Sequence, residues 1–107
     1  MTDLEMTRLC AEAMGYTPYE SKFNPGKIRV GGGGQVDYYD PLHDDAHAMP
    51  LLLFLLTSGE KVVIENNERG TRPILVFRNT VYEIFDTDKL RRAVVECVAK
   101  IQSGKEG

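Results

Sequence analysis

The chain has 107 residues, of which 42% are apolar and 27% charged, and this fits one globular domain with a modest core. Its net charge of −3 argues against a protein that binds nucleic acid without specificity, because such proteins are usually basic. The apolar run at residues 51–56 is too short to cross a bilayer and the N-terminus lacks a signal-peptide pattern, so we expect a soluble cytoplasmic protein.

The first predicted helix spans about residues 3–14. Thr2-Asp3-Leu4-Glu5 has the pattern of a capping box, in which the threonine hydroxyl and the glutamate carboxylate each accept a backbone N–H. Gly15 can adopt the left-handed conformation that ends a helix. Between these signals, apolar residues recur at helical spacing, at Met6, Leu9, Cys10, Ala13 and Met14.

Residues 16–37 form an irregular region. Pro18, Pro25 and Gly26 interrupt regular structure, and a glycine-rich run extends from Gly31 to Gly34. Short stretches of alternating polar and apolar residues precede and follow the glycines. A loose hairpin with a glycine loop and an irregular loop over the domain both fit this pattern.

A second helix is predicted over about residues 44–57. Asp40 and Pro41 can open a preceding helical turn as N-cap and first residue, and Gly59 ends the helix. Pro50 lies inside this span and lacks a backbone donor, which predicts a kink or a later start. Residues 51–56 are apolar on every side, so we expect this helix to be covered on more than one face.

Three strands follow, at residues 61–65, 73–78 and 80–85, with a long polar loop before the second and a tight turn at Asn79-Thr80. A final helix then begins near Asp86 and Asp88. Residues 103–107 have the composition of a frayed polar tail. The apolar face of the final helix is predicted from residues three and four apart, at Leu90, Ala93, Val94, Cys97, Val98 and Ile101.

This order of elements predicts an α+β domain covering residues 1–107. Its centre would be a three-stranded antiparallel meander packed by helices in an α-β-α sandwich. Cys10 and Cys97 each lie among apolar neighbours in a helical pattern, without a CxxC motif. We interpret both as reduced core residues.

Several short motifs resemble a known family. Ala13-Met14-Gly15-Tyr16 closes the first helix, Tyr39-Asp40-Pro41-Leu42 precedes the second with Asp45 and Ala48-Met49, and a meander and a last helix with Cys97 follow. Together they resemble the small bacteriophage proteins of the phage α-β-α sandwich domain family. The resemblance implies a phage or prophage origin and α-β-α layering. It implies no established chemistry, and Pro50 and the glycine run depart from the family pattern.

His43 and His47 are four residues apart, so a helix would place both on one face. Together with Asp44 or Asp40, the two histidines have donor atoms that can ligate a divalent metal. The simpler interpretation is a helix start whose aspartates cap backbone groups and whose histidines are solvated. No HExxH pattern and no third histidine completes a site, so we assign no metal.

The remaining candidates concern binding. The run from Gly31 to Gly34 can cradle a phosphate, but no GK[ST] motif follows it, and the simpler interpretation is a plain loop. Arg69 and Arg72 in the polar loop can contact an acidic partner or a nucleotide, and the simpler interpretation is a solvated hairpin. Tyr38 and Tyr39 either form a recognition patch or cover the edge of the core.

The sequence therefore favours a non-enzymatic phage or prophage protein, without catalytic residues or cofactor, that binds a host or phage macromolecule. Inhibition of a host defence is one form of this activity. The alternative is a small-ligand or nucleotide-binding protein, and the third hypothesis is a metal-dependent hydrolase. The apolar residues 51–56 also predict a homodimer, unless residues 16–37 fold over that helix.

Overall fold

The structure is a computed structural model that describes residues 1–22, 24–32 and 35–106. It contains three helices and two antiparallel sheets of three strands each, so the predicted α+β class is confirmed. The elements follow one another as α1 (Asp3–Ala13), β1 (Tyr19–Glu20), β2 (Ile28–Gly32), β3 (Gln35–Tyr39), α2 (Asp45–Leu56), β4 (Val62–Asn66), β5 (Pro73–Phe77), β6 (Thr80–Glu83) and α3 (Thr87–Glu106).

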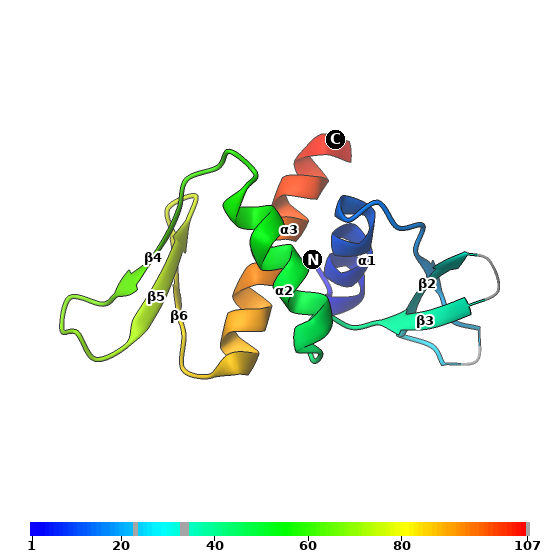
Figure 1. The fold of residues 1–107 in the computed structure, drawn as a ribbon, viewed down its shortest axis with the longest axis horizontal. Helices are drawn as coiled ribbons and strands as arrows, with labels where there is room; N and C mark the ends of the chain where they lie inside the picture. The colour runs from blue at the N-terminus through cyan, green and yellow to red at the C-terminus, as the bar shows by residue number, and fades with distance from the viewer. Residues whose placement is uncertain (23, 33–34, 107) are drawn as a thin grey trace.

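The helices form the middle layer of an elongated molecule that measures 49 × 27 × 22 Å (Figure 1). The sheet β4–β5–β6 lies at one end and the sheet β1–β2–β3 at the other. The expected packing of helices on an antiparallel meander is present. The layer order differs from the expected α-β-α sandwich, because α1 and α2 both pack on α3 and the three helices share one layer between two sheets.

The first helix begins and ends where the sequence predicts. The Thr2 hydroxyl accepts a hydrogen bond from the Glu5 backbone N–H at 3.1 Å, and Gly15 has a φ of +84° just after the helix. Left-handed backbone of this kind favours glycine and ends a helix. Met6, Leu9 and Cys10 are buried in the core that α1 shares with α3.

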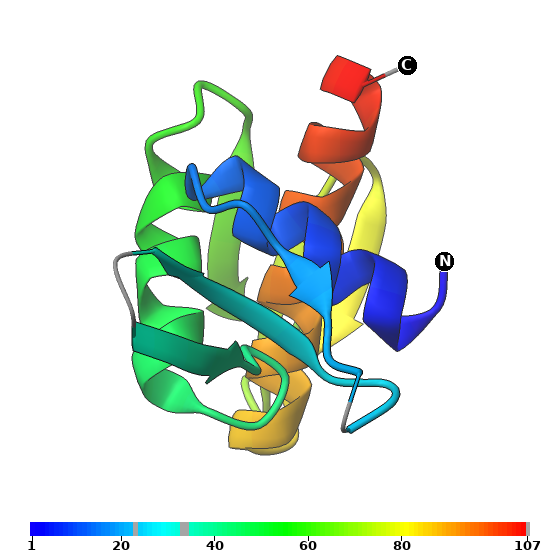
Figure 2. The same cartoon turned by 90° about the vertical axis from the view of Figure 1, so that its right-hand side faces the viewer.

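Residues 16–37 contain a sheet, which corrects their description as an irregular region. The hairpin alternative is the one that the structure contains, since β2 pairs with β3 from Ile28↔Tyr39 to Gly32↔Gln35. Tyr19 and Glu20 add a short third strand on the other edge of β2. This sheet lies over α1 (Figure 2), where β2 contacts the helix and Ile28 is buried.

The second helix has the two-stage start predicted for it. A turn opens at Asp40, whose carbonyl accepts from the Asp44 N–H at 2.9 Å, and the main helix begins at Asp45 with Asp44 as its N-cap. The Asp44 carboxylate accepts from the Ala46 N–H at 2.9 Å. Pro50 is accommodated inside the helix, which continues to Leu56.

The meander places one row of side chains against the helices. Leu75 and Phe77 of the central strand β5 are fully buried, while their neighbours Ile74 and Val76 point the other way, as alternation along a strand requires. The β5–β6 turn is formed by Arg78 and Asn79, both with positive φ. Positive φ at both residues is the geometry of a two-residue hairpin turn. The turn lies one residue before its expected position.

The last helix is longer than expected. Residues 103–106 continue α3 instead of fraying, and the Lys105 ammonium lies 5.6 Å from the centre of the Phe54 ring of α2. This contact helps to hold the last turn against its neighbour. Cys97, Val94 and Val98 are fully buried in the face predicted for them, and both cysteines of the chain are free thiols.

Candidate functional site

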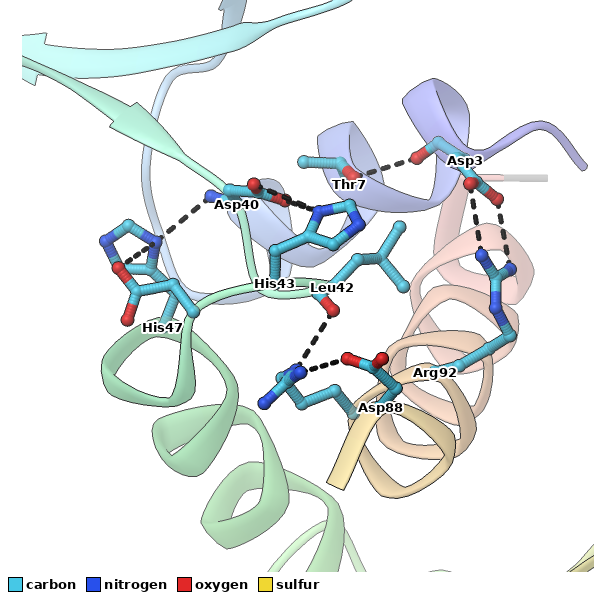
Figure 3. Close-up of polar contacts among 10 residues, drawn as sticks. Asp3, Thr7, Asp40, Leu42, His43, His47, Asp88 and Arg92 are labelled. Atoms are coloured by element: carbon cyan, nitrogen blue, oxygen red, sulfur yellow. Dashed lines mark hydrogen bonds and ion pairs between the residues drawn. The ribbon is translucent and has the colours of Figure 1, made fainter. Parts of the chain in front are cut away.

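The histidine-rich segment joins β3 to α2 (Figure 3). His43 lies in the turn before the helix, so the two histidines do not share a helix face as expected. Its Nδ1 lies 2.9 Å from a carboxylate oxygen of Asp40. His47 lies on α2, and its Nδ1 accepts a hydrogen bond from the Asp40 backbone N–H at 3.0 Å. Both rings are therefore engaged by Asp40, one through its side chain and the other through its backbone.

This arrangement does not gather metal ligands. Throughout the part of the chain that the structure describes, no three His, Cys, Asp or Glu side chains lie close enough to hold a metal ion. The Nδ1 of His47 already serves as a hydrogen-bond acceptor, and Asp44 caps α2. Hydrogen bonding by the two histidines and helix capping by Asp44 therefore account for the contacts of His43, His47 and Asp44.

The two tyrosines considered as a recognition patch have different environments. Tyr39 is a core residue, packed edge-on against Tyr16 and beside the ring of His47, which corrects its assignment as a partner-binding residue. Tyr38 is exposed, its hydroxyl accepts from the Asn24 side chain at 2.5 Å, and its ring lies under Arg29. The hydrogen bond from Asn24 holds the pKa of Tyr38 below its ordinary value.

The two arginines considered for partner binding lie near the β4–β5 hairpin loop. Arg69 is exposed there. Arg72 is half-buried, forms an ion pair with Glu83 at 3.3 Å and places its guanidinium carbon 3.9 Å from the centre of the Phe85 ring. The structure does not bring these arginines together with Tyr38, because the two sheets lie at opposite ends of the molecule (Figure 1).

The face of the meander that points away from the helices carries an apolar row. Val63, Val76 and Val81 are direct cross-strand neighbours on β4, β5 and β6. Val81 is 57% exposed, and the other two are half-buried. We call this surface, with Ile74 beside the row, the outer sheet face. It is an apolar strip across all three strands of the sheet.

Charged and aromatic side chains border the outer sheet face. At one end, Arg72 lies between Glu83 and the exposed ring of Phe85. At the other end, Arg78 binds Glu60 through two hydrogen bonds, of 3.2 and 2.5 Å. A shallow depression of about 330 Å³ lies on this face, lined by Glu60, Lys61, Val63, Glu65, Val76, Arg78 and Asn79.

A second uncovered apolar face belongs to α2. Ala48, Leu51 and Leu55 point into the core and are fully buried. The opposite side of the same helix carries apolar residues along its length, and these are exposed: Ala46, Met49, Pro50, Leu53 and Leu56. We call this surface the outward α2 face.

The glycine run gives no support to a phosphate site. Gly31 and Gly32 are strand residues that pair with Val36 and Gln35. The other half of the run, residues 33 and 34, lies outside the described residues, so the predicted glycine loop is not described. Phosphate binding by Gly31 to Gly34 therefore stays an untested alternative to the plain loop that the sequence favours.

The two thiols are buried away from both faces. Burial raises the pKa of Cys10 to about 12 and that of Cys97 to about 11, from an ordinary value of 9.0. The Cys10 thiol donates to the Val95 carbonyl of α3 at 3.4 Å. Both cysteines therefore serve the packing of the helices, as the sequence indicates.

Comparison with known proteins identifies no relative: no protein family, no curated protein and no solved structure matches this chain. In the described part of the chain, no helix is long and apolar enough to span a membrane.

The outer sheet face was not identified from the sequence, although a signal for it is present. The stretches Val62-Val63-Ile64 and Ile74-Leu75-Val76-Phe77 are apolar at every position. In a strand with only one covered face, alternate positions are usually polar. Continuous apolar strands in a small meander therefore indicate a second face available for contact.

Proposed function

We propose that this protein is a non-enzymatic phage or prophage protein that binds a host or phage protein through the outer sheet face. Inhibition of a host defence is one form that this binding takes. The observation that carries the proposal is the row of Val63, Val76 and Val81, which crosses the sheet on the side away from the helices.

The apolar row supplies a driving force for association. Burying a valine side chain contributes about 1.5–3 kcal/mol relative to leaving it in water. A sheet face also holds its side chains on a rigid backbone, so little conformational freedom is lost on binding. The row is therefore suited to be the centre of a protein interface.

The border of the face supports specific recognition. Arginine and aromatic side chains are enriched among the residues that dominate binding energy, and Arg72 with Phe85 forms such a pair at the surface. Because Glu83 already orients Arg72, the guanidinium is held in place before a partner arrives. Arg72 is also one of the two arginines that the sequence singled out.

The proposal is tested by affinity capture from a lysate of the source organism with three immobilised proteins: the parent, Val81→Glu and Leu53→Glu. Val81 and Leu53 are both exposed apolar residues, at 57% and 64%, on different faces of the molecule. A protein retained by the parent and by Leu53→Glu, and lost with Val81→Glu, supports the proposal. It is then purified and its affinity for each variant is measured by calorimetry.

Two results contradict the proposal. One is a captured protein that Val81→Glu retains as well as the parent does, and the other is the absence of any protein that distinguishes the two. A thermal-shift series with nucleotides tests the small-ligand alternative. Stabilisation of the parent by a nucleotide, without a captured protein, would favour that alternative.

A further inference from the structure

We propose that two copies of this chain pair through the free edge of β4, with the two β4 strands antiparallel about a two-fold axis at Val63. The three-stranded meanders of the two copies then form one continuous sheet. The proposal concerns the edge of the sheet and not its outer face, so it does not depend on the function proposed above.

This edge is a different surface from the one expected from the sequence. The apolar residues 51–56 predict a homodimer through α2, unless residues 16–37 fold over that helix. The strand β2 of that region packs against α1, where Ile28 is buried. The exposed side of α2 is apolar and does not select an occupant, whereas the edge of β4 carries charges that do.

The strand β4 is an edge strand of the meander. The strand order is β4–β5–β6, so β4 is paired on one side only. Figure 1 shows the β4–β5 hairpin at one end of the molecule, with its loop pointing away from the helices. Ile64 faces the buried Leu75 across the two strands and lies on the same side of the sheet, yet Ile64 is 51% exposed. The helices therefore leave this part of β4 uncovered.

The pairing register shows which backbone groups of β4 point outward. Just beyond the strands, the Asn67 N–H donates to the Arg72 carbonyl at 2.7 Å. Hydrogen-bonded pairs alternate along antiparallel strands, so Val63 and Glu65 direct their N–H and C=O groups to β5. The residues whose N–H and C=O groups point outward from the edge are Val62, Ile64 and Asn66.

An edge of this kind is a template for another strand, because its row of outward donors and acceptors can continue the sheet. Edge strands that avoid such pairing often carry a proline or a bulge. Each residue of Val62–Asn66 pairs with one residue of β5, so this strand has no bulge, and it contains no proline. The edge of β4 is therefore suited to accept a strand.

Charge selects a second copy as the occupant. Lys61 and Glu65 lie two residues before and two residues after Val63, and all three line the same depression on the outer side of the sheet. Both charged side chains are exposed, and within the described residues neither forms an ion pair. The ion pairs that this sheet does form join Arg72 to Glu83 and Arg78 to Glu60.

These two charges also fix the register. An antiparallel pair centred on Val63 places Lys61 of each copy directly opposite Glu65 of the other. Opposite charges at facing positions stabilise paired strands. The two-fold axis makes the contact twice, as a self-complementary interface requires. A pair centred one residue further along the chain places Glu65 opposite Val63 and loses both ion pairs.

The same register satisfies the backbone and the apolar side chains. Val62 of each copy faces Ile64 of the other, and their outward N–H and C=O groups bond to each other. Their side chains lie on the helix side of the sheet, where the pairing covers exposed surface of Ile64. On the outer face the two Val63 side chains meet at the axis, so the row formed with Val76 and Val81 continues into the second copy.

The main test is sedimentation equilibrium from about one to several hundred micromolar, where mass action shifts a weak dimer. We expect the parent to approach twice the 12.0 kDa of the chain. Lys61→Glu and Glu65→Lys should each weaken association by about 10-fold or more, because each places like charges opposite one another twice. The double variant, which exchanges the two charges, should restore the association of the parent.

Three controls accompany these variants. The two single variants change the net charge of −3 in opposite directions, so net charge alone cannot explain a loss in both. Glu20→Lys, at an exposed position of β1 in the other sheet, should dimerise like the parent. Val81→Glu should also dimerise like the parent, so a lost partner with an intact dimer, or the reverse, separates this proposal from the proposed function. Circular dichroism confirms that each variant is folded.

Amide hydrogen exchange, measured residue by residue, tests the backbone pairing. The N–H groups of Val62 and Ile64 should exchange more slowly as the protein concentration rises, because they are paired only in the dimer. Those of Val63 and Glu65 are already paired with β5 and should change less. Concentration-dependent protection that leaves Val62 and Ile64 unaffected overturns the proposal.

Three results of the sedimentation experiment overturn the proposal as well. The first is a parent that stays at 12.0 kDa at every concentration. The second is an unchanged dissociation constant for either charge reversal. The third is a double variant that associates as weakly as the single variants do.

Discussion

His47 and Asp40 are joined by a hydrogen bond in which the Asp40 backbone N–H donates to the His47 Nδ1 at 3.0 Å. Asp40 follows directly after β3, and His47 lies in the first turn of α2. The bond therefore ties the end of one sheet to the middle layer of helices. Because Nδ1 accepts, the neutral ring carries its proton on Nε2.

The first prediction compares the two histidines. His47→Ala should lower the free energy of unfolding by about 1 kcal/mol, because the Asp40 N–H loses its partner. His43→Ala should change it by less than about 0.5 kcal/mol, since that ring is largely exposed. Urea unfolding measures both. Neither variant nor the parent should respond to zinc or a chelator, and a zinc-dependent melting temperature lost in the double variant would contradict this.

The second prediction compares two neighbouring arginines of α3. The Arg91 side chain is only 12% exposed, binds Asp45 and Asp88, and donates to the Leu42 carbonyl at 3.0 Å. The Arg92 side chain is 43% exposed and pairs with Asp3. Arg91→Ala should lower the melting temperature by about 5 °C or more, because it frees the start of α2 from α3. Arg92→Ala should have a much smaller effect, and equal losses would contradict this assignment.

The third prediction concerns the hydroxyl of Tyr39. It is buried, and it has no hydrogen-bond partner among the described residues. Burying an unpaired hydroxyl is unfavourable, so Tyr39→Phe should raise the free energy of unfolding by about 1 kcal/mol. Tyr39→Ala should lower it by about 3 kcal/mol or more, because the ring is in the core. Urea unfolding measures both, and a Tyr39→Phe variant less stable than the parent would show that the hydroxyl is bonded.

The fourth prediction follows from the thiols. Burial raises the pKa of Cys10 to about 12 and of Cys97 to about 11, so the folded state keeps both protonated where the unfolded chain ionises. The contribution of the two buried, protonated thiols to the free energy of unfolding is fully present below the ordinary pKa of 9.0. It is lost as the pH rises toward 11–12. For Cys10 the loss is about 1 kcal/mol one pH unit above the ordinary value.

Urea unfolding at increasing pH under reducing conditions measures this loss. A variant with both cysteines replaced by alanine is the control and should lose less stability over the same range. If the parent and the double variant lose stability in parallel, ionisation of the thiols does not cause the loss of stability at high pH.

Local signals in the sequence predict several elements well. Thr2 with Glu5 and Gly15 mark the ends of α1, and Asp40 marks the turn before α2. These signals act within a few residues, through backbone donors and acceptors that must be satisfied at helix ends. Pro50 lies in the second turn of α2, where the N–H that it lacks leaves the Ala46 carbonyl without its helical partner, and the helix nevertheless continues to Leu56.

The arrangement of elements could not be predicted in the same way. The sheet of β1, β2 and β3 contains glycines and short strands, so its side-chain pattern is weak. Whether helices lie outside a sheet or between two sheets depends on contacts far apart in the sequence, such as α1 on α3. Likewise, Tyr38 and Tyr39 are adjacent, and only their strand orientation makes one exposed and the other buried.

The most direct test of the proposed binding surface is hydrogen–deuterium exchange of the parent protein with and without its captured partner. We predict slower exchange at the strands Val62–Asn66, Pro73–Phe77 and Thr80–Glu83, because the partner covers the outer sheet face. Exchange in Ile28–Gly32 should not change. Protection confined to α2 or to the sheet of β1, β2 and β3, with β4, β5 and β6 unaffected, would contradict the account.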